Sequence, residues 1–240
     1  MSFTWSEDRA PPRFVMPRGG WLRIGLRGGA IVLVLGGAVM LALLLRPAEI
    51  ARHGRDRPWT RAIAARLWRA CLRILRLRLE VSGAPMRRPG ALVANHASWL
   101  DILVLGACER VTFVAKSDVA RWPGIGALAA FAGTLFIARD PRQAGIQQRL
   151  IADELLAGRR LLFFPEGTSS DGFRVLPFKS TLFAAFFDRD LKPEAHVQPI
   201  SVIYEAPAGE DPRFHGWWGE MERPRICSGF WRCRTTAACG

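Results

Sequence analysis

The stretch Ala91-Leu92-Val93-Ala94-Asn95-His96-Ala97-Ser98-Trp99-Leu100-Asp101 joins an apolar run to a polar turn and the beginning of a helix. The apolar run at 91–94 is typical of a short buried strand, and Ser98 is suited to cap the helix predicted at 99–107. His96 therefore falls at the carboxyl end of a strand, where open α/β sheets usually bind ligands. Asp101 lies in the first helical turn, from which its carboxylate can reach the imidazole.

Apolar runs and helical patterns alternate along the rest of the chain. The alternation of Leu77, Leu79 and Val81 with charged residues predicts a strand, and further strands are predicted at 91–94, 111–115, 135–137, 161–164 and 197–203. Helices are predicted at 99–107, 118–131, 141–158 and 179–187. This order predicts one α/β domain over residues 77–222, with a mostly parallel, buried sheet flanked by helices.

An apolar segment at 28–45 precedes this domain. It contains 18 residues without a charge, which is the lower limit for a helix that spans a membrane. The predicted disordered, basic flank at 1–27 is too long for a signal peptide, so we expect a retained membrane helix, spanning or re-entrant. Lys and Arg are more frequent on the C-terminal side, which predicts that the α/β domain lies on the cytoplasmic side of the cell inner membrane.

The chain is strongly basic, with a net charge of +13 and twelve Arg between residues 46 and 90. Such a charge indicates an anionic partner. Nucleic-acid binders rarely place Arg beside an apolar run of membrane length, so we expect a membrane surface with anionic lipids as the partner and no nucleic acid. An acidic protein is a second candidate for the same basic surface.

Within the basic segment at 46–76, residues 59–76 have the pattern of an amphipathic helix. Its two nearly opposite faces carry Ile63, Leu67, Cys71 and Ile74 on one side and Arg66, Arg69, Arg73 and Arg76 on the other. The helix lies in the headgroup region of a membrane, or it packs its apolar face on the domain core. The pattern fits both alternatives.

A second polar turn, Phe164-Pro165-Glu166-Gly167-Thr168, follows the apolar run at 161–164. Pro ends a strand, Gly permits a tight turn, and hydroxyl and backbone N–H groups can hold a polar headgroup. A serine nucleophile elbow is excluded because the chain lacks G-x-S-x-G, and no cysteine pair has the C-x2-C spacing of a zinc site. An imidazole oriented by a carboxylate can instead act as a base on an alcohol. Alone, the pairing of His96 with Asp101 also fits a turn histidine beside a helix-capping aspartate.

Four blocks in order resemble the glycerolipid acyltransferase family, typified by 1-acylglycerol-3-phosphate acyltransferases. N-H-x-S-x-x-D lies at 95–101, G-x-x-F-I-x-R at 133–139, F-P-E-G-T at 164–168, and a short apolar strand around Pro at 197–200. The resemblance covers roughly residues 77–205. It implies direct transfer of a fatty acyl group from acyl-carrier protein or coenzyme A to a lysolipid hydroxyl, without a metal, a cofactor or a covalent acyl-enzyme.

The resemblance also implies roles for individual residues. His96 is the expected general base and Asp101 its orienting partner. The expected substrate-binding residues are Asn95, Ser98, Gly133, Arg139, Glu166, Gly167, Thr168 and Lys179.

The acceptor depends on the position after Thr168. Many relatives that bind a phosphate have Arg there, whereas this chain has Ser169, which weakens the case for a phosphate. The extension around Asp171 resembles the branch that acylates lyso-ornithine lipid, whose amine would suit an acidic side chain. In the alternative, Arg139 and Lys179 hold the phosphate of 1-acylglycerol-3-phosphate. A lipid-binding protein without activity and a lipid esterase are the alternatives outside this family.

Residues 223–240 differ from the rest of the chain. They show no periodicity and contain Cys227, Cys233 and Cys239, three of the five cysteines. We expect either a frameshifted or truncated tail or a disordered basic end, in both cases without the domain's final strand.

Overall fold

The computed structural model describes residues 19–54, 56–122, 125–138, 144–180, 183, 186, 196–206, 209–217 and 233–239. Within these ranges one sheet has the strand order β1-β7-β6-β2-β5-β3-β4. Its strands are β1 Leu77–Ser82, β2 Gly90–Ala94, β3 Thr112–Lys116, β4 Leu135–Ile137, β5 Arg160–Phe163, β6 His196–Glu205 and β7 Cys233–Cys239. β6, β2, β5, β3 and β4 are parallel, whereas β7 is antiparallel to β6 and parallel to β1. The prediction of a mostly parallel α/β sheet is confirmed.

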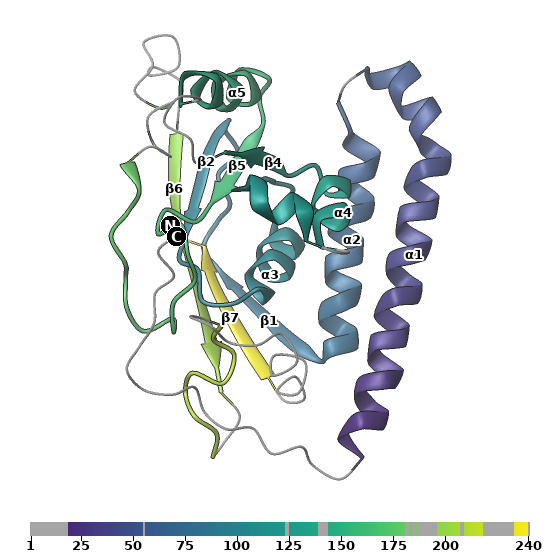
Figure 1. The fold of residues 1–240 in the computed structure, drawn as a ribbon, viewed down its shortest axis with the longest axis vertical. Helices are drawn as coiled ribbons and strands as arrows, with labels where there is room; N and C mark the ends of the chain where they lie inside the picture. Colours follow the sequence, from purple (N-terminus) through teal and green to yellow (C-terminus); the bar gives the residue numbers. More distant parts are fainter. Residues whose placement is uncertain are drawn as a thin grey trace.

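Helices cover both faces of this sheet (Figure 1). They are α1 Gly20–His53, α2 Pro58–Leu75, α3 Leu100–Cys108, the 3-10 helix η1 Ser117–Arg121, α4 Ile125–Phe131 and α5 Ala144–Leu156. Alternate side chains of a strand enter different cores, because successive residues point to opposite faces. Leu162 packs with residues of α2 and α3, whereas its neighbours Leu161 and Phe163 pack with Ile151 and Leu155 of α5. Burial on both faces explains why β5 is apolar from Leu161 to Phe163.

The helix pair α2–α3 packs closely at Gly106. A Cβ on Gly106 would lie 2.5 Å from Cδ1 of Trp68, so only glycine lets the two helices approach this far. Ile63, Leu67 and Cys71 are buried and Ile74 is half-buried, which shows that the apolar face of α2 packs on the core. Of the two alternatives for this helix, core packing is therefore the observed one. Its arginines at 66, 69 and 73, with Arg76 at the cap, are exposed.

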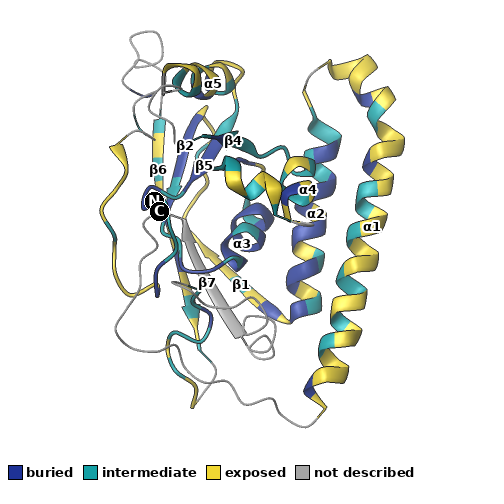
Figure 2. Cartoon of the chain, viewed as in Figure 1, coloured by how far each residue is buried: buried dark blue, intermediate teal, exposed yellow. Residues whose placement is uncertain are grey.

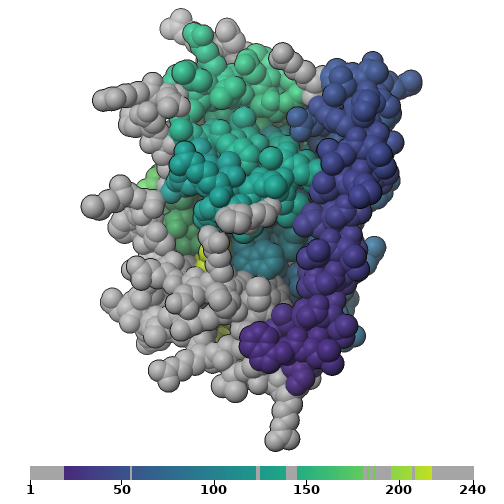
Figure 3. All heavy atoms as spheres, turned by 45° about the vertical axis from the view of Figure 1, so that its right-hand side comes forward, coloured from purple at the N-terminus to yellow at the C-terminus, as the bar shows by residue number. Residues whose placement is uncertain are grey.

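The first helix lies alongside α2 on the outside of the domain (Figures 1 and 3). Ile31, Leu35 and Ala38 pack against the core, but most of the apolar surface of α1 is exposed (Figure 2). The stretch includes Leu22, Leu26, Val32, Leu33, Met40, Leu43 and Leu44, all more than 60% exposed. By length and composition α1 could cross a membrane.

Glu49 connects α1 to the beginning of α2. Its carboxylate is fully buried and accepts hydrogen bonds from the backbone N–H groups of Trp59 and Thr60 at 2.8 and 2.9 Å. The Thr60 hydroxyl and Arg46 donate at 2.6 and 3.0 Å. The cap residue of α2, Arg57, makes no side-chain capping bond, so Glu49 satisfies the free N–H groups of this helix from outside it.

The structure differs from the predicted elements in three places. Residues 20–27 are helical rather than disordered, since α1 begins at Gly20. The helix predicted at 118–131 is divided, because Trp122 precedes Pro123 and is extended, with ψ 126°. The tail was expected to lack the final strand, yet the backbone of Cys233–Cys239 forms β7 between β1 and β6. The helix predicted at 179–187 falls mostly outside the described residues.

Candidate active site

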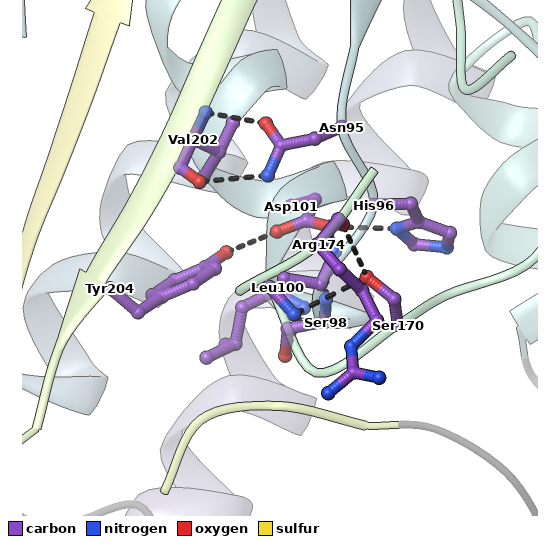
Figure 4. A network of polar contacts seen from close by, with 11 residues as sticks. Asn95, His96, Ser98, Leu100, Asp101, Ser170, Arg174, Val202 and Tyr204 are labelled. Carbon is purple, nitrogen blue, oxygen red and sulfur yellow. Dashed lines mark hydrogen bonds and ion pairs between the residues drawn. The ribbon is translucent and has the colours of Figure 1, made fainter. Parts of the chain in front are cut away.

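The predicted pair of His96 and Asp101 forms at the carboxyl end of β2, a strand that lies between β6 and β5 in the sheet (Figure 4). Nδ1 of His96 lies 2.7 Å from Oδ2 of Asp101. An ionised carboxylate can only accept, so Nδ1 carries the hydrogen and donates it. This leaves Nε2 as the nitrogen with a free lone pair, in the position of a base.

The carboxylate of Asp101 is fully buried and surrounded by donors. Its Oδ2 also accepts from the backbone N–H groups of Ala97 and Ser98 at 2.9 and 3.0 Å. Its Oδ1 accepts from the hydroxyl of Tyr204 at 2.6 Å. A buried charge is stable only when it is hydrogen-bonded, and these four donors meet that condition. The turn, the helix and β6 together fix the carboxylate.

The imidazole of His96 is held flat against the ring of Phe164, with centroids 4.0 Å apart and planes 14° apart. Phe164 is the first residue of the predicted F-P-E-G-T block. The His96 side chain keeps 19% of its surface exposed, while its partner Asp101 has none. The pair is thus anchored on one side and accessible on the other, as a base that meets a substrate requires.

Glu166 connects the F-P-E-G-T turn to the turn that carries His96. It is buried, and its carboxylate accepts from the backbone N–H of Leu176 at 3.0 Å and from the backbone N–H of His96. Burial raises the pKa of Glu166, although these two hydrogen bonds and the nearby imidazole oppose the rise. The backbone N–H of Ser170 in turn donates to the carbonyl of His96 at 2.8 Å. The two turns predicted from sequence are therefore held together by contacts in both directions.

The remaining predicted residues lie in different settings. The Asn95 amide exchanges two hydrogen bonds with the backbone of Val202, at 3.0 and 2.8 Å. Ser98 is buried and accepts from the N–H of Leu100 at 3.3 Å, but the cap position of α3 is Trp99, one residue after the predicted one. Both residues hold the turn that carries His96.

Four further predicted residues are less enclosed, and one is not described. Gly167 lies in the tight turn with φ 69°, and Thr168 beside it is half-buried. Gly133 adopts φ 78° where α4 ends, a conformation that favours glycine. Lys179 is exposed, and its N–H donates to the carbonyl of Pro165 at 2.8 Å. Arg139 lies outside the described residues.

Sequence reasoning missed Tyr204 and His215. Tyr204 lies in a strand that was predicted, but nothing near it in the sequence indicates a contact with Asp101. His215 is buried 5.7 Å from the Tyr204 ring, measured between centroids, and burial lowers its pKa to about 4. Both residues line a cavity of about 70 Å³, as does Ala97 of the turn that carries His96. Among the described residues, no group of three or more His, Cys, Asp or Glu could hold a metal ion.

Comparison with known proteins agrees with this geometry. The family model described as Acyltransferase matches residues 78–203, which include the four blocks. The chain belongs to the acyltransferase family. It is an enzyme of that family, and its His–Asp pair and F-P-E-G-T turn lie inside the matched region.

Two curated acyltransferases are similar to it. The lyso-ornithine lipid O-acyltransferase of Rhodobacter capsulatus is 52% identical over 90% of this chain and 79% of that protein. The lyso-ornithine lipid O-acyltransferase of Rhizobium meliloti is 39% identical over 77% of this chain and 62% of that protein. Among solved structures, the 1-acyl-sn-glycerophosphate acyltransferase of Thermotoga maritima matches with a TM-score of 0.52 at 22% identity, covering 89% of this chain and 85% of that one. This last match supports the acyltransferase fold.

Proposed function

We propose that this acyltransferase moves a fatty acyl group from a thioester to the hydroxyl of lyso-ornithine lipid, with His96 as the general base. The observation that carries this proposal is the contact between the buried carboxylate of Asp101 and Nδ1 of His96, whose oxygen and nitrogen atoms lie 2.7 Å apart. This contact keeps the hydrogen on Nδ1 and leaves Nε2 as an acceptor. A lipid-binding protein without activity has no need of such an oriented base.

The reaction follows from the position of the two nitrogens. Nε2 of His96 removes the proton from the acceptor hydroxyl as its oxygen attacks the thioester carbonyl carbon. The Asp101 carboxylate stabilises the imidazolium that forms. The tetrahedral intermediate then breaks its carbon–sulfur bond, and the imidazolium returns the proton to the leaving thiolate. The products are an ester and a free thiol, so no metal, cofactor or acyl-enzyme takes part.

Around this pair we assign substrate contacts to the predicted residues nearest the accessible side. Gly167 and Thr168 offer a turn with backbone and hydroxyl donors for the reacting groups. Lys179 is tied through its backbone to the same turn. Gly133 and Arg139 of the second block are assigned to the acceptor side on the strength of the family resemblance.

Two observations support an amino-acid headgroup rather than a phosphomonoester. Ser169 stands where a phosphate-binding arginine is expected, and the relative at 52% identity is named for lyso-ornithine lipid.

The expected pairing of Asp171 with the ornithine amine needs revision. Its carboxylate is buried and accepts from Arg174 and from the N–H of Phe173, both at 3.1 Å. The half-exposed Arg174 guanidinium is the better candidate contact, toward the ornithine carboxylate.

The donor is acyl-carrier protein or coenzyme A. The arginines at 66, 69 and 73 of α2 remain exposed after the apolar face has packed, so they form a basic surface for an acidic carrier protein or for anionic lipids. We propose no nucleic-acid partner.

The site of action is the cytoplasmic face of the inner membrane. The exposed apolar side chains of α1 provide the contact with lipid. A helix α1 that crossed the bilayer upright would bring the adjacent α2 and its exposed arginines into hydrocarbon, at about 2.5–3.5 kcal/mol for each arginine. We therefore propose that the exposed apolar side of α1 enters one leaflet from the cytoplasmic side while the α2 arginines stay at the level of the headgroups, which is the re-entrant alternative.

The test supplies the purified protein in lipid vesicles with labelled acyl-carrier protein or acyl-coenzyme A and one of two acceptors. We expect label in ornithine lipid at a higher kcat/KM than in phosphatidate from 1-acylglycerol-3-phosphate. His96→Ala should bind vesicles normally and transfer no acyl group. Transfer by that variant would contradict the mechanism, and a preference for the phosphate acceptor would contradict the assigned acceptor. Release of free fatty acid instead of lipid product would indicate the esterase alternative.

A further inference from the structure

Tyr204 of β6 donates a hydrogen bond to the Asp101 carboxylate (Figure 4). The other hydrogen bonds to this carboxylate that the described part of the chain shows come from residues 96–98, in the turn before α3. We propose that Tyr204 is a positioning residue, which sets the orientation and basicity of the His96–Asp101 pair through its hydroxyl. The inference rests on the proposed function, in which His96 is the base.

The two carboxylate oxygens of Asp101 have different partners. Oδ2 accepts from His96 and from the backbone N–H groups of Ala97 and Ser98. Oδ1 accepts from Tyr204 at 2.6 Å, a length typical of a hydroxyl that donates to a charged oxygen. Asp101 is fully buried, so loss of this donor would leave Oδ1 without the hydrogen bond that compensates for its desolvation.

The strand β6 places Tyr204 and also holds the turn that carries His96. Its residues Val202 and Tyr204 are two apart and lie on the same face of the strand. Val202 binds the Asn95 amide through both its N–H and its carbonyl, and Tyr204 binds Asp101. The pairing of β6 with β2 ends at Ile200, so both contacts are made where β6 extends beyond the end of β2. One strand therefore sets the position of the base and of its carboxylate.

The hydroxyl also affects the electrostatics of the pair. A hydrogen bond donated to a carboxylate stabilises its charge and makes it a weaker partner for the imidazolium. The other described titratable groups here are Glu166, from the turn after β5 and near both His96 and Asp101, and His215, beside the Tyr204 ring. The hydrogen bond seen at Oδ1 comes from Tyr204. A change at the Tyr204 hydroxyl should therefore change the basicity of His96 without removing a contact with the substrate.

The first experiment compares Tyr204→Phe with wild type in vesicles, using labelled acyl-carrier protein and lyso-ornithine lipid. We expect kcat to fall roughly 10- to 100-fold while KM for the acceptor changes little, because one hydrogen bond to a buried charge is lost away from the substrate. The acidic limb of the pH profile of kcat/KM should move to higher pH, since the unshielded carboxylate favours the imidazolium. Ser201→Ala is the matched control. It removes an exposed hydroxyl from the same strand and should leave both readouts unchanged.

The second experiment keeps every contact and changes only the strength of the donor. The chain contains one tyrosine, so biosynthetic replacement of tyrosine by fluorinated tyrosines alters position 204 alone. A more acidic phenol donates a stronger hydrogen bond, so the acidic limb should move to lower pH as fluorination increases. The shift is opposite to that of Tyr204→Phe, which a purely structural role does not predict.

The outcomes separate the inference from the function on which it rests. If His96→Ala retains transfer, the proposed function fails. If that variant is inactive but the acidic limb is unmoved in the fluorinated proteins, the role of Tyr204 is overturned. Should Tyr204→Phe fail to fold, the fluorinated series still decides, because those proteins retain the hydroxyl.

Discussion

At the scale of single residues, the site depends on how completely Asp101 is satisfied. Four donors, three from the turn before α3 and one from β6, converge on a carboxylate without solvent exposure. The arrangement has two consequences. It keeps the carboxylate from rotating away from His96, and it makes the imidazole orientation independent of bound substrate.

Asp101→Asn tests the charge of this group at nearly constant shape. An amide cannot accept with both ends, so either the Tyr204 contact or the contact with His96 Nδ1 becomes a donor–donor clash. We expect kcat for acyl transfer to fall about 10³-fold or more, because the imidazolium is no longer stabilised and the wrong tautomer is favoured. KM for the lysolipid should change little.

The measurement is steady-state transfer to lyso-ornithine lipid, with circular dichroism to confirm the fold. Asp118→Asn, an exposed aspartate on η1, is the control and should be fully active. A kcat within about tenfold of wild type in Asp101→Asn would show that the carboxylate acts only as a scaffold.

At the scale of elements, the distribution of apolar residues along the sequence predicted the buried strands. β4 is predicted without error at 135–137, and β2 and β5 within one residue, because buried strands must be apolar on both faces. The contacts of Tyr204 and Glu49 were not predictable in this way. Tyr204 meets Asp101 across 103 positions and Glu49 meets Thr60 across 11, so neither pairing leaves a periodic signal. The strand at 233–239 was missed because its residues show no alternation.

Glu49→Ala tests the hydrogen bonds that connect α1 to the beginning of α2. It leaves the N–H groups of Trp59 and Thr60 without their acceptor and removes a negative charge from the beginning of a helix. We expect the free energy of unfolding to fall by about 2 kcal/mol, measured by urea unfolding in detergent. Glu80→Ala removes an exposed carboxylate that pairs with Arg78 on β1, and it should change stability by less than about 1 kcal/mol.

The same hydrogen bonds of Glu49 predict that the stability of the protein falls in acid. Burial opposes ionisation of Glu49, but hydrogen bonds from Thr60, Arg46 and Trp59 outweigh it and hold the pKa of this carboxyl below its ordinary value of 4.5. The stabilising contribution is therefore present above that ordinary value and is lost as the pH falls through the lower, folded-state value. Wild type should lose more stability than Glu49→Ala over this acidic range, and equal losses would show that Glu49 is not the group responsible.

At the scale of the whole molecule, the sheet, its helices and α1 form successive layers (Figure 1). α1 has 34 residues and is about 51 Å long, well beyond the roughly 30 Å of a bilayer's hydrocarbon core. It lies alongside α2, whose apolar face is packed on the domain core. In the proposed placement the membrane contact is made by α1, which is fixed to the rest of the domain through α2.

Thiol labelling from one side of the membrane distinguishes a hairpin in one leaflet from a spanning α1. Single cysteines replace Leu22 and Arg52, exposed positions near opposite ends of α1, in a protein whose accessible native cysteines are changed to serine. If both ends of α1 lie on the cytoplasmic side, an impermeant reagent labels both positions in inverted vesicles and neither in right-side-out vesicles. Ser82→Cys, exposed at the end of β1, reports the side of the catalytic domain. Labelling of the Leu22→Cys protein from the side opposite to Ser82→Cys would show that α1 spans the bilayer. Because the α2 arginines are costly in hydrocarbon, α2 would then have to lie elsewhere relative to the membrane.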